Sequence, residues 1–82
     1  MTRDEVLSVV LGQLGKVLPD VRLDRVDPSQ RMSDLGASSL DRMDVVVASQ
    51  GELGIQVPAS QFADVADIAG LVEVLHAHCG RQ

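Results

Sequence analysis

The sequence predicts an all-α fold, a small four-helix bundle with a long first loop and a short third helix. Apolar residues recur at three- and four-residue steps in residues 3–18 and 68–78, which places them on one face of a helix, and residues 40–53 follow a helical period with apolar residues on two sides. Proline follows residues 3–18 and glycine follows residues 40–53, which predicts the ends of these two segments. A length of 82 residues allows one modest core, so residues 1–82 are expected to form a single domain, ordered at about residues 3–78.

The first helix is expected from Arg3 to about Leu18. Asp4 and Glu5 lie in its first turn, where acidic side chains interact favourably with the helix dipole. Pro19 then ends the helix. The face expected to point inward carries Val6, Leu7, Val10, Leu11, Leu14, Val17 and Leu18.

Residues 20–34 form a long connection with no sustained helical period. A loop of this length inside a compact domain needs contacts that hold it in place. We expect a structured loop whose scattered apolar side chains hold it across the helix ends: Val21, Leu23, Val26, Met32 and Leu35.

The second helix, expected from Leu40 to about Leu53, has apolar residues on two sides. One side is assigned to the core: Val45, Val46, Ser49 and Leu53. The opposite side carries Leu40, Met43, Val47 and Gly51, with Asp44 beside them. Since a surface helix needs only one apolar stripe, the second stripe indicates either a helix buried all round or an exposed patch that docks partner proteins. Acidic residues around such a patch would attract basic partners: Asp41, Asp44 and Glu52.

The remaining third of the chain is expected to close the bundle. Gly54 ends the second helix, and Ile55 and Val57 then fill the core from an extended turn. A short third helix is expected over 59–65, with Phe62 as its only large anchor. Asp67 is expected to cap a last helix from Ile68 to about His78 that turns Ile68, Leu71, Val72 and Leu75 inward, and Arg81 and Gln82 are expected to form a disordered tail.

Composition excludes several classes of function. The net charge of −5 and the lack of clustered Lys and Arg argue against nucleic acid and favour a basic protein partner. No apolar run approaches the roughly 20 residues that span a bilayer, so no membrane partner is expected. One cysteine, Cys79, allows no internal disulfide, and no signal peptide opens the chain, so we expect a cytoplasmic protein.

Two groups of residues could suggest a metal site or a catalytic site, but neither is expected to form one. His76, His78 and Cys79 cannot complete a tetrahedral shell, and no second Cys/His pair occurs, so no metal site is expected. Nothing in the spacing supports Ser39 as a nucleophile activated by a histidine, and the short chain offers no obvious oxyanion hole. No catalytic residue is therefore assigned, and the chain is not expected to be an enzyme.

The stretch from Asp34 to Asp41 reads Asp-Leu-Gly-Ala-Ser-Ser-Leu-Asp. It predicts a turn at Gly36 followed by a helix that begins at Ser38 and Ser39, because serine is favoured where a side-chain oxygen accepts a free backbone N–H. A hydroxyl at that point lies on a rigid element and faces water. The helix behind it supplies a partial positive charge that favours a phosphate ester.

These residues resemble the acyl carrier protein family, whose modified serine lies in a Leu-Gly-x-Asp-Ser-Leu context. The register places the family's phosphopantetheine serine on Ser39 and leaves Ser38 where most of the family has Asp. The resemblance covers nearly the whole chain. It implies that a phosphopantetheinyl transferase attaches 4'-phosphopantetheine from coenzyme A to Ser39, and that the thiol of this arm holds acyl groups as thioesters.

The resemblance also implies which residues meet partner enzymes. In the family the helix after the serine is the shared recognition surface, and Leu40, Met43, Asp44 and Val47 match its contact positions. With their neighbours, the expected partner-binding residues are Leu40, Asp41, Arg42, Met43, Asp44 and Val47. The partners implied are a phosphopantetheinyl transferase and an acyltransferase, ketosynthase or HMG-CoA-synthase-like enzyme, and the chain itself is expected to be a monomer.

A finer resemblance concerns the run from Gly36 to Arg42. It is similar to freestanding donor carriers of polyketide β-branching cassettes, which often read Gly-Ala-Asn-Ser-Ile-Asp-Arg and present an acetyl group to an HMG-CoA-synthase-like enzyme. The Asp41-Arg42 pair favours this subtype, since a positive residue early in the helix would help partners discriminate by charge. A general fatty-acid or polyketide extension carrier, a peptidyl carrier and an unmodified helical interaction module remain alternatives.

Overall fold

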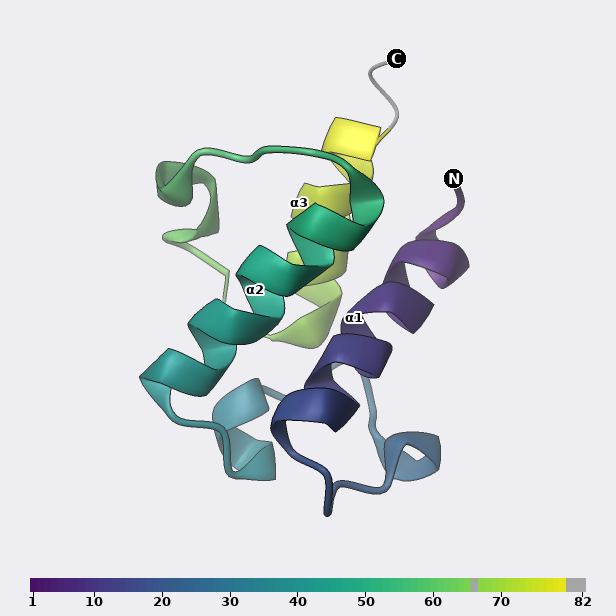
Figure 1. Cartoon of the computed structure of the whole chain (residues 1–82), viewed down its shortest axis with the longest axis vertical. Coiled ribbons are helices and arrows are strands. Elements are labelled where there is room, and N and C mark those ends of the chain that lie inside the picture. Colours follow the sequence, from purple (N-terminus) through teal and green to yellow (C-terminus); the bar gives the residue numbers. More distant parts are fainter. Residues whose placement is uncertain (66, 80–82) are drawn as a thin grey trace.

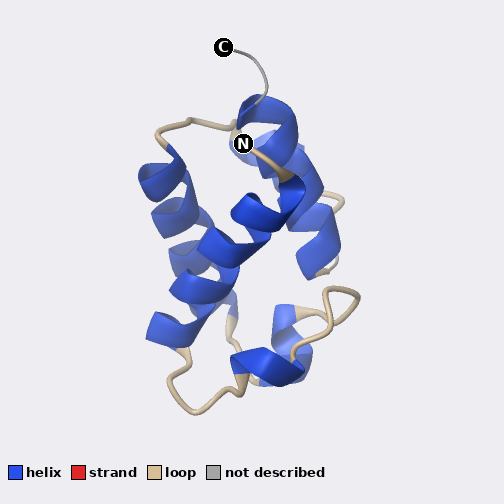
Figure 2. Cartoon of the chain, turned by 90° about the vertical axis from the view of Figure 1, so that its right-hand side faces the viewer, coloured by secondary structure: helices blue, strands red, loops and turns tan. Residues whose placement is uncertain are grey.

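A computed structural model describes residues 1–65 and 67–79, and the expected tail at Arg81 and Gln82 lies outside these residues. Helices and turns make up the described part of the chain, which contains no strand, so the predicted all-α class is confirmed (Figure 2). The α-helices are α1 (Arg3–Val17), α2 (Ser39–Leu53) and α3 (Ile68–Cys79), and the 3₁₀ turns are η1 (Leu23–Arg25), η2 (Met32–Leu35) and η3 (Ala59–Phe62).

The predicted count of four helices is wrong, because the short third helix is only the 3₁₀ turn η3. Its bonds span three residues: the Gln61 N–H donates to the Pro58 carbonyl at 2.9 Å and the Ala63 N–H to the Ser60 carbonyl at 3.3 Å. A segment this short cannot offset the cost of nucleating an α-helix, whereas the tighter 3₁₀ turn is common in short connections.

The three α-helices form an open arrangement around α1. In Figure 1, α1 runs down the molecule while α2 and α3 run up it, so α1 is antiparallel to both. Helix α1 packs closely on α2 and on α3, whereas α2 and α3 contact each other much less. This looser seam leaves space between α2 and the segment that holds η3.

The first helix follows the prediction to within one residue. Its predicted inward face is confirmed, since Val6, Val10 and Leu14 are fully buried and the other members are partly buried. The cap at Thr2 was not anticipated: its hydroxyl accepts the Glu5 N–H at 3.2 Å, and the Glu5 carboxylate accepts the Thr2 N–H at 3.0 Å. This reciprocal pair satisfies donors that would otherwise lack a partner.

Backbone hydrogen bonds fix the long loop to the start of α3. The Ile68 N–H donates to the Gln30 carbonyl at 3.1 Å, and the Ala69 N–H donates to the Pro28 carbonyl at 2.8 Å. The first N–H groups of a helix have no acceptor within the helix, so these loop carbonyls serve as their acceptors. Asp67 completes the start of α3 as predicted, because its carboxylate accepts the Gly70 N–H at 2.7 Å.

Four of the five apolar side chains expected to hold the loop lie in the core or pack against it, whereas Val21 does neither among the described residues. Met32 is buried in the core, and Leu23 of η1 packs against the core from outside. Leu23 lies so close to Gly15 of α1 that a Cβ there would come 3.0 Å from its Cδ1. Gly15 therefore allows close approach of the loop to α1.

Aliphatic side chains from every helix and from the loop build the core. The predicted inward residues of α3 are all buried, as is Val57, with Ile55 and Phe62 partly buried against them. The fully buried side chains are Val6, Val10, Leu14, Val45, Ser49, Ile68, Leu71 and Leu75. Ser49 is the exception in this apolar set, and its hydroxyl has no hydrogen-bond partner among the described residues.

Candidate functional site

The chain enters α2 through a turn that needs a glycine. Gly36 ends η2 with φ of +95°, a conformation that residues with a side chain rarely adopt. The Ala37 N–H then donates back to the Met32 carbonyl at 3.1 Å, and both of these side chains are buried. The turn is therefore held from the core side, so that the next residues begin α2 at a fixed place on the surface.

The two serines that follow have different roles. Ser38 is the N-cap of α2: its hydroxyl accepts the Asp41 N–H at 3.1 Å, and the Asp41 carboxylate accepts the Ser38 N–H at 2.9 Å. Ser39 is the first residue of the helix, is exposed, and makes no side-chain hydrogen bond within the described part of the protein. The Ser39 hydroxyl is thus accessible, while the Ser38 hydroxyl is engaged.

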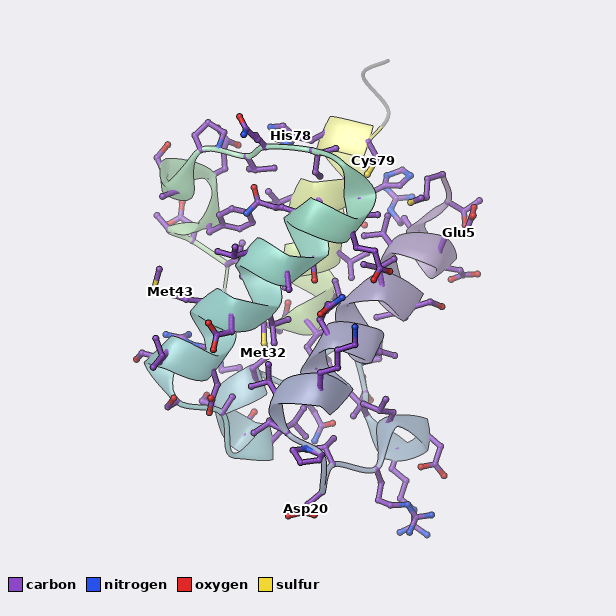
Figure 3. All side chains as sticks on the ribbon, viewed as in Figure 1. Glu5, Asp20, Met32, Met43, His78 and Cys79 are labelled. Atoms are coloured by element: carbon purple, nitrogen blue, oxygen red, sulfur yellow. The ribbon has the colours of Figure 1, made fainter. Side chains whose placement is uncertain are left out.

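The predicted outer stripe of α2 is exposed. Leu40, Met43 and Val47 are 69%, 63% and 63% exposed, whereas Val45 and Ser49 on the opposite side are fully buried. Met43 points away from the bundle and Met32 points into it (Figure 3). The alternative of a second helix that is buried all round is therefore wrong.

Charged residues surround this stripe, and they differ in availability. Asp44 and Arg42 are exposed, whereas Asp41 is half-buried and its carboxylate caps the helix. Glu52 is exposed and accepts a hydrogen bond at 3.0 Å from Gln13, a mostly buried residue of α1. The structure thus places the predicted partner-binding residues on one stretch of α2, from Leu40 to Val47, with Asp44 as their most exposed acid.

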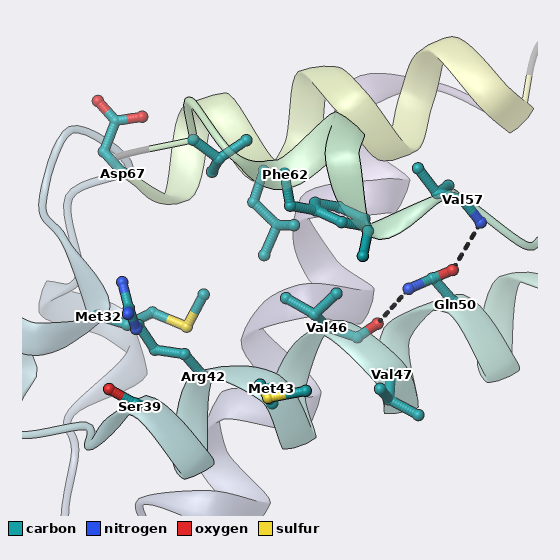
Figure 4. Close-up of a pocket in the computed structure, with 13 residues that line it drawn as sticks. Met32, Ser39, Arg42, Met43, Val46, Val47, Gln50, Val57, Phe62 and Asp67 are labelled. Atoms are coloured by element: carbon teal, nitrogen blue, oxygen red, sulfur yellow. Dashed lines mark hydrogen bonds between the residues drawn. The ribbon is translucent and has the colours of Figure 1, made fainter.

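A groove of about 450 Å³ lies between α2 and the segment around η3 (Figure 4). Ser39 lines one end of this groove, near Met32. Most of its lining is aliphatic or aromatic, including Met32, Val46 and Phe62. The described residues of the lining also include one cation, Arg42, and one anion, Asp67. The candidate attachment point therefore lies at one end of an apolar groove.

Gln50 shapes this groove and was not recognised from the sequence. Its side-chain oxygen accepts the Val57 N–H at 2.7 Å, and its amide donates to the Val46 carbonyl at 3.4 Å (Figure 4). These bonds hold the segment after α2 beside the helix. No signal in the sequence pairs residues 50 and 57, because their contact depends on the path of the loop between them.

The histidines of α3 have no cluster of possible metal ligands around them in the described residues. The His78 ring contacts the Val74 carbonyl within α3 at 3.0 Å, and residues 1–65 and 67–79 contain no group of three His, Cys, Asp or Glu side chains that could hold a metal ion. No helix in the same residues combines the length and apolar character needed to cross a membrane.

Comparison with known proteins shows which family the chain belongs to. A model of the phosphopantetheine attachment site matches residues 4–75. The chain is 28% identical over 76 residues to the polyketide biosynthesis acyl-carrier-protein AcpK of Bacillus subtilis, covering 93% of each.

Two further relatives are acyl carrier proteins. That of Clostridium acetobutylicum is 27% identical over 78 residues, covering 95% of this chain and 96% of the relative. That of Campylobacter hominis is 36% identical over 77 residues, covering 89% and 91%. No solved structure matches the chain.

The local structure fits the cofactor that these matches imply. An exposed hydroxyl at the first turn of α2 can form a phosphate ester, and the groove beside it has room for part of a flexible arm. The chain belongs to the acyl carrier protein family, whose members carry covalently bound 4'-phosphopantetheine and act as carriers rather than catalysts.

Proposed function

We propose that Ser39 holds the phosphopantetheine arm. The observation that carries this assignment is the division of labour between the two serines, since Ser38 caps α2 and Ser39 has an exposed, unengaged hydroxyl. Ser38 is the neighbouring serine that could compete for the arm, but its hydroxyl caps the helix. The positive end of the α2 dipole also favours the negative charge that modification adds.

The attachment step requires only the Ser39 oxygen from this chain. That oxygen bonds to the phosphorus next to the pantetheine of coenzyme A, the bond from phosphorus to the pyrophosphate oxygen breaks, and adenosine 3',5'-bisphosphate leaves. The serine proton passes to a base of the transferase. The arm then supplies a thiol that holds acyl groups as thioesters, and the tether gives partner enzymes a high effective concentration of cargo.

Partner enzymes are proposed to dock on the outer face of α2. Three exposed apolar side chains lie on this face within two helical turns, Leu40, Met43 and Val47. Exposed apolar groups beside charges are typical of interaction surfaces. Asp44 adds a negative charge that would steer basic partners, and the net charge of −5 acts in the same direction. The docking residues proposed are Leu40, Asp41, Arg42, Met43, Asp44 and Val47.

For cargo, we propose an acetyl donor in polyketide β-branching. The run from Gly36 to Arg42 supports this through its similarity to donor carriers, and a relative named for polyketide biosynthesis is 28% identical. In this role the acetyl-loaded chain meets an HMG-CoA-synthase-like enzyme, which joins the acetyl group to a β-keto intermediate on a second carrier.

The attachment site is tested by intact mass after incubation with coenzyme A and a broad-specificity phosphopantetheinyl transferase. We expect a phosphopantetheine-sized increase in the wild-type chain and in Ser38→Asp, which keeps an N-cap oxygen and restores the acid common in the family. The increase should be lost in Ser39→Ala. Modification of Ser39→Ala would overturn the assignment, and no modification with any transferase would favour an unmodified interaction module.

The donor role is tested with the acetyl-loaded chain, an HMG-CoA-synthase-like enzyme and a second carrier loaded with a β-ketoacyl group. The new carbon–carbon bond joins the acetyl methyl carbon to the ketone carbon, the methyl proton ends on the ketone oxygen, and water releases this chain's thiol. The second carrier should therefore gain the elements of acetic acid. Efficient use by an extending ketosynthase, with no such gain, would favour the general extension carrier.

A further inference from the structure

Arg42 stands out among the residues that line the groove. Among the described residues it is the one positively charged member of a lining that is otherwise mostly apolar, and its side chain is exposed. Within the described part of the chain, the ion pairs join Arg3 to Glu73 and Arg22 to Asp24, so Arg42 takes part in neither. A cation at the edge of an apolar groove provides a site for an anion.

The nearby acids form no ion pair with Arg42 within the described part of the chain. Asp67, the anion in the groove lining, accepts the Gly70 N–H at 2.7 Å. Asp41, next to Arg42 in sequence, accepts the Ser38 N–H at 2.9 Å. Asp44 is two residues from Arg42, a spacing at which helical side chains do not face each other. The guanidinium group is therefore available to an anion that arrives at the groove.

Arg42 and Ser39 share one side of α2. Residues three apart on a helix are neighbours, with Cβ atoms about 5–6 Å apart, and both residues line the groove. In Figure 4 the Arg42 side chain extends from α2 toward the end of the groove where Ser39 and Met32 lie. A phosphate ester on Ser39 would thus form within reach of the guanidinium group.

We propose that Arg42 forms an ion pair with the phosphodiester on Ser39 and directs the arm along the groove. The inference rests on the proposed attachment at Ser39. A guanidinium group suits phosphate because its N–H groups form a fork that can bind two oxygens at once. The two methyl groups that follow the phosphate in pantetheine would then meet the apolar lining at Met32 and Val46.

This pairing makes Arg42 a positioning residue. Held at its phosphate end, the arm lies against α2 and η3 instead of sampling all directions. The contact is exposed, so salt should weaken it as the screening length shortens from about 10 Å at 0.1 M to about 3 Å at 1 M.

Nuclear magnetic resonance of the modified protein without cargo tests the proposal, because the phosphodiester is then the one anion that the arm carries. We expect nuclear Overhauser cross-peaks between the geminal methyl protons of the arm and the methyl protons of Val46. They should be lost in Arg42→Gln and weakened at high salt. Arg25→Gln is the matched control, since Arg25 is an exposed arginine of η1 that does not line the groove.

Intact mass and the amide spectrum separate the possible failures. Mass shows whether each variant is modified, and the amide spectrum shows whether it is folded. Without a modified protein the attachment proposal fails, and this inference fails with it. A folded, modified wild type with no cross-peaks, or cross-peaks that persist in Arg42→Gln, would overturn the role of Arg42 and leave the attachment at Ser39 intact.

Discussion

Ser38 and Asp41 cap α2 reciprocally, each accepting the backbone N–H of the other at 3.1 and 2.9 Å. This capping box satisfies two donors at the start of the helix and holds Ser39 between its partners. Ser39 takes no part in this cap, and its hydroxyl is exposed at the first helical position. The same local structure thus stabilises the helix and presents the candidate attachment point.

Replacing Ser38 by Ala should lower the free energy of unfolding by about 1 kcal/mol, since an N-cap oxygen is lost. Ser38→Asp should unfold close to the wild type, because aspartate caps as well as serine. Ser39→Ala removes no cap and is the control. Urea titration of the three unmodified variants measures the differences, and equal destabilisation by Ser38→Ala and Ser39→Ala would contradict the assigned roles.

Ser49→Ala should stabilise the protein, because the Ser49 hydroxyl is fully buried and has no partner among the described residues. Removing an unsatisfied buried hydroxyl should raise the free energy of unfolding by about 1 kcal/mol. Alanine also has a higher helix propensity than serine. Ser8→Ala, at an exposed position of α1, measures the effect of this difference in propensity alone. A gain at Ser49 no larger than that at Ser8 would argue that the hydroxyl costs nothing.

Gly12 and Gly15 should respond differently to alanine although both lie in α1. A Cβ at Gly12 meets nothing within 4 Å, so Gly12→Ala should raise the free energy of unfolding by about 1 kcal/mol. A Cβ at Gly15 would lie 3.0 Å from Leu23 Cδ1, so the Leu23 side chain would have to move away from α1. Thermal unfolding of the two variants should therefore rank Gly12→Ala above Gly15→Ala, and the reverse order would contradict the close approach of η1.

Acid should weaken the link between α1 and α3. The Arg3 guanidinium, which donates to the Glu73 carboxylate at 3.1 Å from its Nη2, holds the Glu73 pKa below its usual 4.5. A carboxyl whose pKa is lower in the folded state stabilises the protein above its unfolded pKa, and this contribution is lost as pH falls through the folded pKa.

Urea titrations on either side of pH 4.5 can measure this contribution. Stability should fall less on acidification in Glu73→Gln than in the wild type, since the variant cannot protonate at this position. Asp64→Asn, an exposed acid whose side chain makes no hydrogen bond within the described residues, is the control. If Glu73→Gln has the same pH dependence as the wild type, the Arg3–Glu73 ion pair does not contribute to the loss of stability in acid.

Local sequence patterns were sufficient for the three α-helices and their faces, but not for η3. The spacing of Val6, Val10 and Leu14 predicted a buried face, and the two apolar sides of α2 separated into a buried one at Val45 and an exposed one at Met43. These features depend on neighbours within a few residues, so the periodicity of the chain carries them. The glycines at positions 36 and 54, both with positive φ, likewise follow from the preference of one residue.

Contacts between distant parts of the chain could not be read in this way. The loop is tied to α3 through the carbonyls of Pro28 and Gln30, and any residue can offer a carbonyl. Gln50 meets Val57 only because the chain turns back after Gly54. The groove between α2 and η3 depends on both contacts.

The amino-acid sequence was enough to predict a small all-helical carrier with a serine at the start of its second helix, because helical period, capping preference and a short motif are local properties. The folded chain was needed to show that the third helix is a single 3₁₀ turn, that the outer stripe of α2 stays exposed, and that Arg42 and Ser39 share an apolar groove. The physical reason is that burial and access depend on what the rest of the chain places beside each residue.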